Sequence, residues 1–208
     1  MRIPLAGPGL AFVLGGLCVA ALGVIFLPWG LAASALGLFF AGFSAYFFRD
    51  PERVTPSDPS AIYSPGDGTV LVVRKEGPGD LITVRIFLSV MNVHVQRAPI
   101  AGTVEKIHYQ PGGFAMAMKP EARENERNVV TFTNGEFHVV VEQIAGFVAR
   151  RIECWVEVGR ALAAGERYGM IRYGSQAAVH LPDSCEILVK AGDKVAGGLT
   201  PIARRPKP

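Results

Sequence analysis

The stretch GMIRYGSQAAVHLP, residues 169–182, has the pattern of two β-strands joined by a turn. Apolar residues stand on both sides of Gly174-Ser175, and glycine and serine are common in the loops between strands. On this pattern alone, Ser175 would only separate two strands. Whether this serine has a chemical role depends on the remainder of the chain.

Short β segments fill the chain from Arg49 onward. They are rich in valine and isoleucine, and most are separated by glycine, proline or asparagine, which is typical of a β-barrel or β-sandwich. The segments are TVLVV (69–73), LITVRIFL (81–88), VHV (93–95), GTVEKIHY (102–109), NVVTFT (128–133), FHVVVEQIAG (137–146), RIECWVEV (151–158) and EILVK (186–190). We therefore predict a mainly β domain over residues 49–208.

The turns of this domain repeat one pattern. It occurs in YSPGDGTVLVV (63–73), RAPIAGTVEKIHYQPGG (97–113) and VKAGDKVAGG (189–198). The pattern resembles the interlocked β-hairpins of biotinyl and lipoyl domains, and AMAMKP (115–120) is similar to the biotin-acceptor tetrapeptide. An alternative function is therefore a noncatalytic carrier or membrane adaptor with Lys119 as the acceptor. Because Pro120 stands where a methionine usually follows that lysine, we expect shared β architecture rather than shared function.

No charged residue occurs between Arg2 and Arg49, a run of 46 positions. Roughly 20 apolar residues cross a bilayer, so the run is long enough for two spans. It divides at LPWG (27–30), where proline and glycine break helices and tryptophan suits the membrane interface. We predict a membrane hairpin over residues 1–48, with transmembrane helices at about 5–27 and 31–48.

A cleaved signal peptide is the alternative interpretation of this run. Signal peptides have an apolar region of roughly 7–15 residues followed by a polar mature chain. Here a second apolar run follows the first immediately, which favours the hairpin.

Basic residues flank the hairpin on both sides. Arg2 precedes the first predicted span, Arg49 and Arg53 follow the second, and the link between the spans carries no charge. The positive-inside rule then places both ends in the cytoplasm. We expect a protein of the cell (inner) membrane whose β domain faces the cytoplasm.

Charge and cysteine content exclude some classes of partner. The formal net charge is only +3, and outside the hairpin its excess lies in the tail ARRPKP, which is typical of a solvated chain end. We expect no nucleic-acid partner. Cys18, Cys154 and Cys185 have neither CxxC spacing nor a disulfide pattern, and they suggest no metal site.

Three polar residues each have an ordinary structural explanation when they are taken singly. Asp67 lies in the tight turn PGDG, where aspartate is common. His94 lies in a strand-like segment, in which alternation gives it the same face as Asn92 and Gln96. Ser175 has no GxSxG context of the kind found at a nucleophile elbow. Their combination in one chain carries more information.

Five motifs in order resemble the short, prokaryotic form of the phosphatidylserine decarboxylase proenzyme family. They are FFRDPER (47–53), SPGDGTV (64–70), NVHVQRAPIAGTV (92–104), ENERNVV (124–130) and GERYGMIRYGS (165–175). Each motif is weak by itself, but five in sequence, after the expected membrane segment, are a strong match.

The resemblance implies that the chain cleaves itself between Gly174 and Ser175. The products would be a β chain (1–174) and an α chain (175–208), and Ser175 would become a covalent pyruvoyl cofactor without any metal. Longer family members more often have Leu-Gly-Ser-Thr at this point. The present chain keeps the Gly-Ser pair and has Gln176 after it.

The family pattern also supplies roles for the two other residues. His94 would be the base that takes the proton of the Ser175 hydroxyl, and Asp67 would orient that base. Longer members have a second histidine where this chain has Arg97, so His94 would serve processing, turnover or both. His180 is a second candidate for the proton donor in turnover. His108 and His138 lie in strand-like segments and are expected to be structural.

Turnover in this family forms a Schiff base between the pyruvoyl group and phosphatidylserine, releases CO₂ and yields phosphatidylethanolamine. Phosphatidylserine in the bilayer is thus the expected partner, together with the contact between the β chain and its own α chain. A diacyl lipid remains in the membrane, which explains a tethered enzyme. Arg49, Arg53 and Arg97 are candidates for headgroup binding, and homo-oligomerisation is left open.

Overall fold

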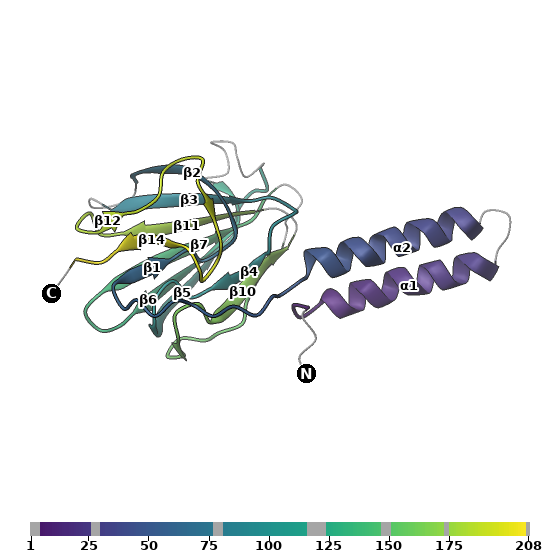
Figure 1. Cartoon of the computed structure of the whole chain (residues 1–208), viewed down its shortest axis with the longest axis horizontal. Helices are drawn as coiled ribbons and strands as arrows, with labels where there is room; N and C mark the ends of the chain where they lie inside the picture. The colour runs from purple at the N-terminus through teal and green to yellow at the C-terminus, as the bar shows by residue number, and fades with distance from the viewer. Residues whose placement is uncertain are drawn as a thin grey trace. The chain divides into compact units, whose positions relative to one another are not determined.

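The computed structural model describes residues 5–25, 30–76, 81–115, 124–146, 151–172 and 175–206. The chain divides into two compact units, Met1–Glu52 and Arg53–Pro208 (Figure 1). The first unit holds two helices and the second holds the strands. The prediction of a mainly β fold preceded by a pair of apolar helices is confirmed.

The two helices, α1 (Gly9–Ile25) and α2 (Gly30–Phe47), pack against each other through small residues. Buried small residues recur every seven positions, which is close to two helical turns, so they line one face of each helix. They are Gly9, Gly16 and Gly23 on α1 and Gly30, Gly37 and Ser44 on α2. A Cβ on Gly16 would lie only 2.7 Å from the backbone nitrogen of Ala41. Such close backbone contact through small residues is typical of helices that associate in membranes.

Large apolar side chains cover the outer surface of the helix pair. Exposed examples are Leu10, Leu14, Leu17, Leu22 and Ile25 on α1 and Leu31, Leu36, Leu38 and Phe39 on α2. Among the described helices, α2 is long and apolar enough to cross a membrane, whereas α1 has 17 residues. Helix α1 is shorter than the predicted span 5–27, whereas α2 has the same length as the predicted span 31–48 and begins one residue earlier. Residues 27–29 of the predicted break lie outside the described residues.

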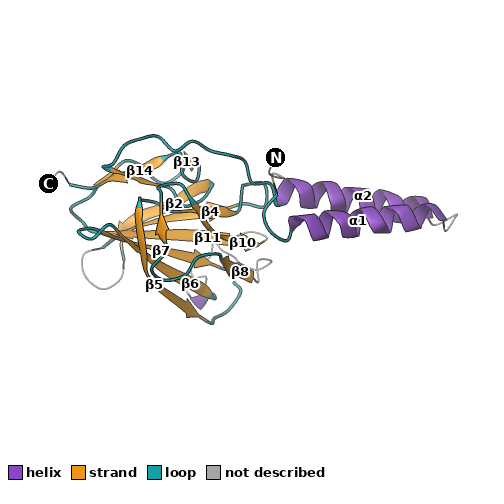
Figure 2. Ribbon diagram, turned by 90° about the horizontal axis from the view of Figure 1, so that it is seen from below, coloured by secondary structure: helices purple, strands orange, loops and turns teal. Residues whose placement is uncertain are grey.

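The second unit is built on a curled sheet of eight antiparallel strands in the order β13-β2-β3-β11-β7-β6-β5-β9 (Figure 2). The strands are β2 (Gly68–Lys75), β3 (Ile82–Leu88), β5 (Gly102–Gln110), β6 (Arg127–Thr133), β7 (His138–Ile144), β9 (Ala161–Leu162), β11 (Ser175–Leu181) and β13 (Lys194–Val195). Strand β11 therefore lies well inside the sheet, between β3 and β7.

Two small sheets complete this unit. One has the order β1-β14-β12, and the other has the order β4-β10-β8. Their strands are β1 (Ala61–Tyr63), β14 (Pro201–Arg204), β12 (Glu186–Ile187), β4 (Val95–Arg97), β10 (Arg167–Arg172) and β8 (Arg151–Cys154). The main hydrophobic core draws residues from all three sheets, including Val84 of β3, Ile202 of β14 and Tyr168 of β10. Tyr168 meets Phe132 of β6 edge to face, with ring centroids 5.1 Å apart.

Several strand ends differ from the predicted segments; the segment predicted at 186–190, for example, ends as β12 at Ile187. The segment predicted at 93–95 becomes β4 only from Val95 onward, so His94 stands just before the strand. The segment predicted at 151–158 ends as β8 at Cys154, after which the chain turns toward the short strand β9. The architecture of interlocked hairpins that biotinyl and lipoyl domains share stays a prediction.

Candidate active site

Ser175 is the first residue of β11 and is completely buried. It pairs with Leu88, the last residue of β3. Alternation along β11 gives its side chain the same face as Ala177 and Val179, which belong to the hydrophobic core. Its Oγ has no hydrogen-bond partner among the described residues. Buried hydroxyl groups normally have one, so this serine is set apart from an ordinary strand residue.

His94 is also completely buried, and its ring is held by the backbone. Nδ1 lies 2.9 Å from the carbonyl oxygen of Asn92. Because a carbonyl oxygen only accepts hydrogen bonds, Nδ1 must carry the proton in this contact. In the neutral ring, Nε2 is then the nitrogen with the lone pair. This tautomer suits a general base that acts through Nε2.

The topology brings His94 and Ser175 to the two ends of one short segment. The backbone N–H of Ile171 donates to the carbonyl of His94 over 3.4 Å, while Ser175 pairs with Leu88. A single turn connects Leu88 to His94 in the chain. The segment from Ile171 to Ser175 is therefore held at both ends by residues 88–94. Gly174 of the predicted cleavage site lies within it, but outside the described residues.

Asp67 belongs to a turn that packs beside this region, but its carboxylate binds other groups. Arg53 donates to Oδ1 and Oδ2 over 2.6 and 2.9 Å, and the N–H of Gly197 donates to Oδ1 over 2.8 Å. Among the described residues, no hydrogen bond joins Asp67 to His94. The structure thus brings His94 and Ser175 to one segment, and it holds Asp67 in a separate ion pair.

Gln96 is a residue of this region to which the sequence analysis assigned no role. It is completely buried, and neither its Oε1 nor its Nε2 has a hydrogen-bond partner among the described residues. A Cβ on Gly66 would lie 2.8 Å from Nε2 of Gln96 and 3.3 Å from Cδ2 of Leu88. The carboxamide therefore lies close to the residue with which Ser175 pairs. The face that alternation predicts for Gln96 and His94 was the signal that could have identified it.

The remaining histidines lie elsewhere in the β unit. His180 is on the outer face of β11, where Nδ1 is 2.8 Å from Oγ1 of Thr83 and Nε2 is 3.2 Å from Oε1 of Glu142. His138 is half exposed and pairs with Glu105 over 2.8 Å. His108 is exposed on β5. None of these three rings lies on the core-facing side of the sheet, where alternation places the side chain of Ser175.

The three arginines that were candidates for headgroup binding have partners within the chain. Arg49 donates to the carbonyl of Tyr46 over 2.7 Å, and Arg53 pairs with Asp67. Arg97 is buried and donates to the carbonyl of Gly165 over 3.0 Å. In the described part of the chain, no three histidine, cysteine or acidic side chains gather as metal ligands would.

Comparisons with known proteins identify the family. The family model described as phosphatidylserine decarboxylase matches residues 40–203. A phosphatidylserine decarboxylase proenzyme of Desulfotalea psychrophila is 44% identical over 165 residues, which cover 76% of this chain and 77% of that protein. The proenzyme of Gluconacetobacter diazotrophicus is 46% identical over 176 residues, 79% of this chain and 78% of its own length. The chain belongs to the phosphatidylserine decarboxylase family.

Proposed function

We propose that this protein is a membrane-tethered decarboxylase that cuts its own chain between Gly174 and Ser175 and then converts phosphatidylserine to phosphatidylethanolamine and CO₂. Membership of the family supports the reaction. The observation that carries the assignment to a residue is Ser175, a completely buried serine whose Oγ has no partner among the described residues. A pyruvoyl group formed from this residue would fit the same position, because it needs neither a metal nor a separate binding pocket.

Self-cleavage begins when Oγ of Ser175 attacks the carbonyl carbon of Gly174. The C–N bond breaks, an ester forms, and the serine nitrogen becomes an amine. Loss of the α-proton of Ser175 then expels the Gly174 carboxylate. The remaining dehydroalanine takes up water and releases ammonia, which leaves the pyruvoyl group at the start of the α chain.

His94 is proposed to take the proton of the Ser175 hydroxyl at Nε2, the nitrogen that its contact with Asn92 leaves with the lone pair. Asp67 is proposed to favour the imidazolium through its negative charge. The carbonyl of Asn92, rather than Asp67, holds the tautomer of the described ring. Once formed, the pyruvoyl group supplies an electron-withdrawing carbonyl for decarboxylation.

The α chain is proposed to stay attached after cleavage, because its strands are shared with the β chain. Strand β11 pairs with β3 on one side and with β7 on the other. Strand β14 pairs with β1, and β13 pairs with β2. Its release would break backbone pairing at all four places.

The helix pair is proposed to anchor the enzyme in the inner membrane with the β unit in the cytoplasm. The apolar outer surface of both helices and their close packing through small residues support the anchor. The basic residues that flank the pair support the orientation. C-terminal fusions test it: a reporter that works only in the cytoplasm should be active, and activity of only an external reporter would overturn the orientation.

The intact mass of the purified protein tests self-cleavage. Wild-type protein should give fragments 1–174 and 175–208, the smaller with a blocked N-terminus, whereas Ser175→Ala should remain a single chain. A homogeneous wild-type chain of 208 residues would overturn the proposal. The same spectrum would reveal biotin on Lys119, the mark of a carrier domain. Release of CO₂ from phosphatidylserine vesicles tests the second reaction.

A further inference from the structure

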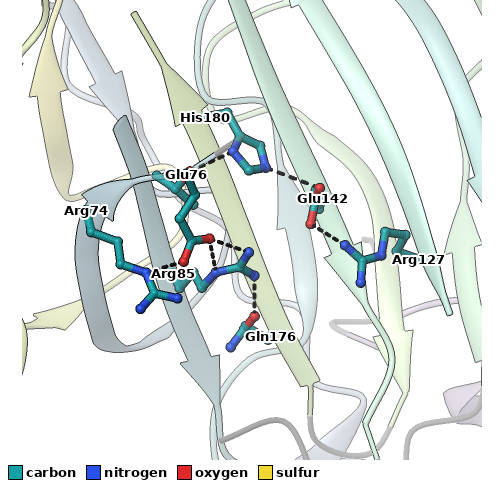
Figure 3. A network of polar contacts seen from close by, with 8 residues as sticks. Arg74, Glu76, Arg85, Arg127, Glu142, Gln176 and His180 are labelled. Atoms are coloured by element: carbon teal, nitrogen blue, oxygen red, sulfur yellow. Dashed lines mark hydrogen bonds and ion pairs between the residues drawn. The ribbon is translucent and has the colours of Figure 1, made fainter. Parts of the chain in front are cut away.

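Arg85 is a nearly buried cation on the outer face of β3, beside β11 (Figure 3). Its Nε and Nη2 donate to Oε2 of Glu76 over 2.8 and 2.6 Å. Its Nη1 donates to Oε1 of Gln176 over 2.8 Å. A guanidinium with a rigid fork of donors can hold both groups in fixed directions.

Glu76 keeps Arg85 in this orientation. Burial by itself would raise the pKa of the Glu76 carboxyl, but hydrogen bonds and positive charge from Arg85 and Arg74 outweigh it, so the pKa is lowered. The carboxylate is therefore ionised at neutral pH. Arg74 contacts its other oxygen, so two cations share one anion. The end of Arg85 that reaches Gln176 is thus fixed by a charge-assisted pair.

Gln176 directly follows the residue that reacts. Its backbone lies between Phe87 of β3 and Ile144 of β7, and its side chain is buried against Arg85. Cleavage before Ser175 would make residue 175 a chain end, and chain ends fray unless they are tied down. After cleavage, the peptide bond to Gln176 is the covalent link that keeps the reactive group in the sheet.

We propose that Arg85 is a positioning residue that acts through Gln176 to hold residue 175 in its reactive position before and after cleavage. The inference rests on the proposed self-cleavage at Gly174-Ser175. A displacement of about 1 Å at a reacting group can cost roughly 100-fold in rate. A side-chain contact one residue away can therefore affect the reaction rate strongly, because it fixes the position of residue 175. This anchor works from the outer face, while the hydroxyl reacts on the inner face.

Variants of the full-length protein in phosphatidylserine vesicles test the proposal. In Arg85→Met and in Gln176→Met, self-cleavage should slow, and kcat of the cleaved enzyme should fall about 10- to 100-fold with little change in KM. The double variant should be no slower than either single variant, because both remove the same contact. Gln176→Glu should keep most of the activity, since its carboxylate accepts the same N–H.

Glu142→Gln is the matched control. Glu142 is on the same outer face, but its partners are His180 and Arg127. It should lower thermal stability and leave kcat near the wild-type value. Additive losses in the double variant, or equal kcat losses in Glu142→Gln and Arg85→Met, would overturn the positioning role. If Arg85→Met does not fold, the comparison of kcat between Gln176→Met and Gln176→Glu tests the proposal by itself. Equal kcat values in these two variants would overturn the positioning role. Failure of the wild type to cleave would instead refute the proposed function.

Discussion

The two faces of strand β11 differ in whether their polar side chains have partners. On the outer face, Gln176 binds Arg85, and His180 lies beside Glu142 (Figure 3). The other ring nitrogen of His180 lies 2.8 Å from Oγ1 of Thr83. On the inner face, Ser175 stands at the end of an apolar row, and its Oγ has no partner among the described residues. Buried polar groups are normally hydrogen-bonded, so a missing partner calls for an explanation. The contrast separates residues that hold the strand from Ser175, the residue that we propose to react.

Replacing His94 tests the reacting side most severely. His94→Ala should slow the appearance of the two fragments by roughly 10²–10⁴-fold, because an unassisted serine hydroxyl is a poor nucleophile. Time-resolved intact mass measures the rate. His180→Ala is the control from the outer face and should cleave at nearly the wild-type rate. A normal rate in His94→Ala would remove His94 from processing, and decarboxylation by the processed enzyme would then test its role in turnover.

Asp67 has a proposed role in the reaction and a role in stability. It is the proposed electrostatic partner of His94, and it forms an ion pair with Arg53. Asp67→Ala should lower the free energy of unfolding by about 3 kcal/mol, since Arg53 stays nearly buried without its counter-ion. Asp67→Asn should also slow cleavage because it loses the charge. Chemical denaturation and the cleavage rate are measured on the same samples.

The double variant Arg53→Met/Asp67→Leu separates these roles. Replacing a buried ion pair by apolar side chains is often close to neutral for stability, so stability should recover. Cleavage should stay slow if the charge of Asp67 supports the imidazolium. Recovery of both would limit Asp67 to a structural role.

The sequence predicts strand β11, which carries the proposed reactive serine, but not the contacts that distinguish the two faces of this strand. Apolar and β-branched runs bounded by turn residues predict β3 and β11, and both strands are buried at nearly every position. The roles that we propose for Ser175, His94 and Asp67 rest on the resemblance of ordered motifs. Arg85 and Gln176 are 91 positions apart, and nothing local indicates that they meet. The contact depends on the register of β3 with β11, which only the folded sheet fixes.

Acid should remove the contribution that the outer-face carboxylates make to folding stability, while the apolar packing of the inner face does not depend on pH. Burial by itself would raise the pKa of Glu142. Its hydrogen bond to His180 and the charges of His180, Arg127 and Arg85 outweigh this effect, so the net shift of the pKa is downward. The pKa of Glu76 is lowered as well. The unfolded chain therefore binds more protons at acid pH. Stability from these carboxylates is complete above about 4.5, their ordinary value, and is lost as the pH falls through the lowered value.

Melting temperatures measured across this acid range check the prediction. Glu142→Gln should flatten the dependence on pH. Glu105→Gln, which removes a half-exposed pair with His138, should leave the dependence unchanged because exposed pairs contribute little. Identical slopes in the wild type and Glu142→Gln would show that the outer network does not set acid stability.

Replacing Gln96 should give the smallest change in stability of these variants. It also tests whether a buried polar group without a partner contributes to the proposed reaction. A carboxamide that is buried without a partner costs about 1–3 kcal/mol, so replacing it with an apolar side chain of similar volume should stabilise the fold. We expect Gln96→Met to raise the free energy of unfolding by about 1 kcal/mol and yet to slow self-cleavage. A gain in stability with a loss of rate is the combination expected where a site keeps an unpartnered polar group for its reaction. Denaturation and time-resolved mass on one preparation measure both quantities. A loss of stability in Gln96→Met would mean that the carboxamide has a partner in solution, and Gln96 would then be a structural residue rather than a part of the proposed site.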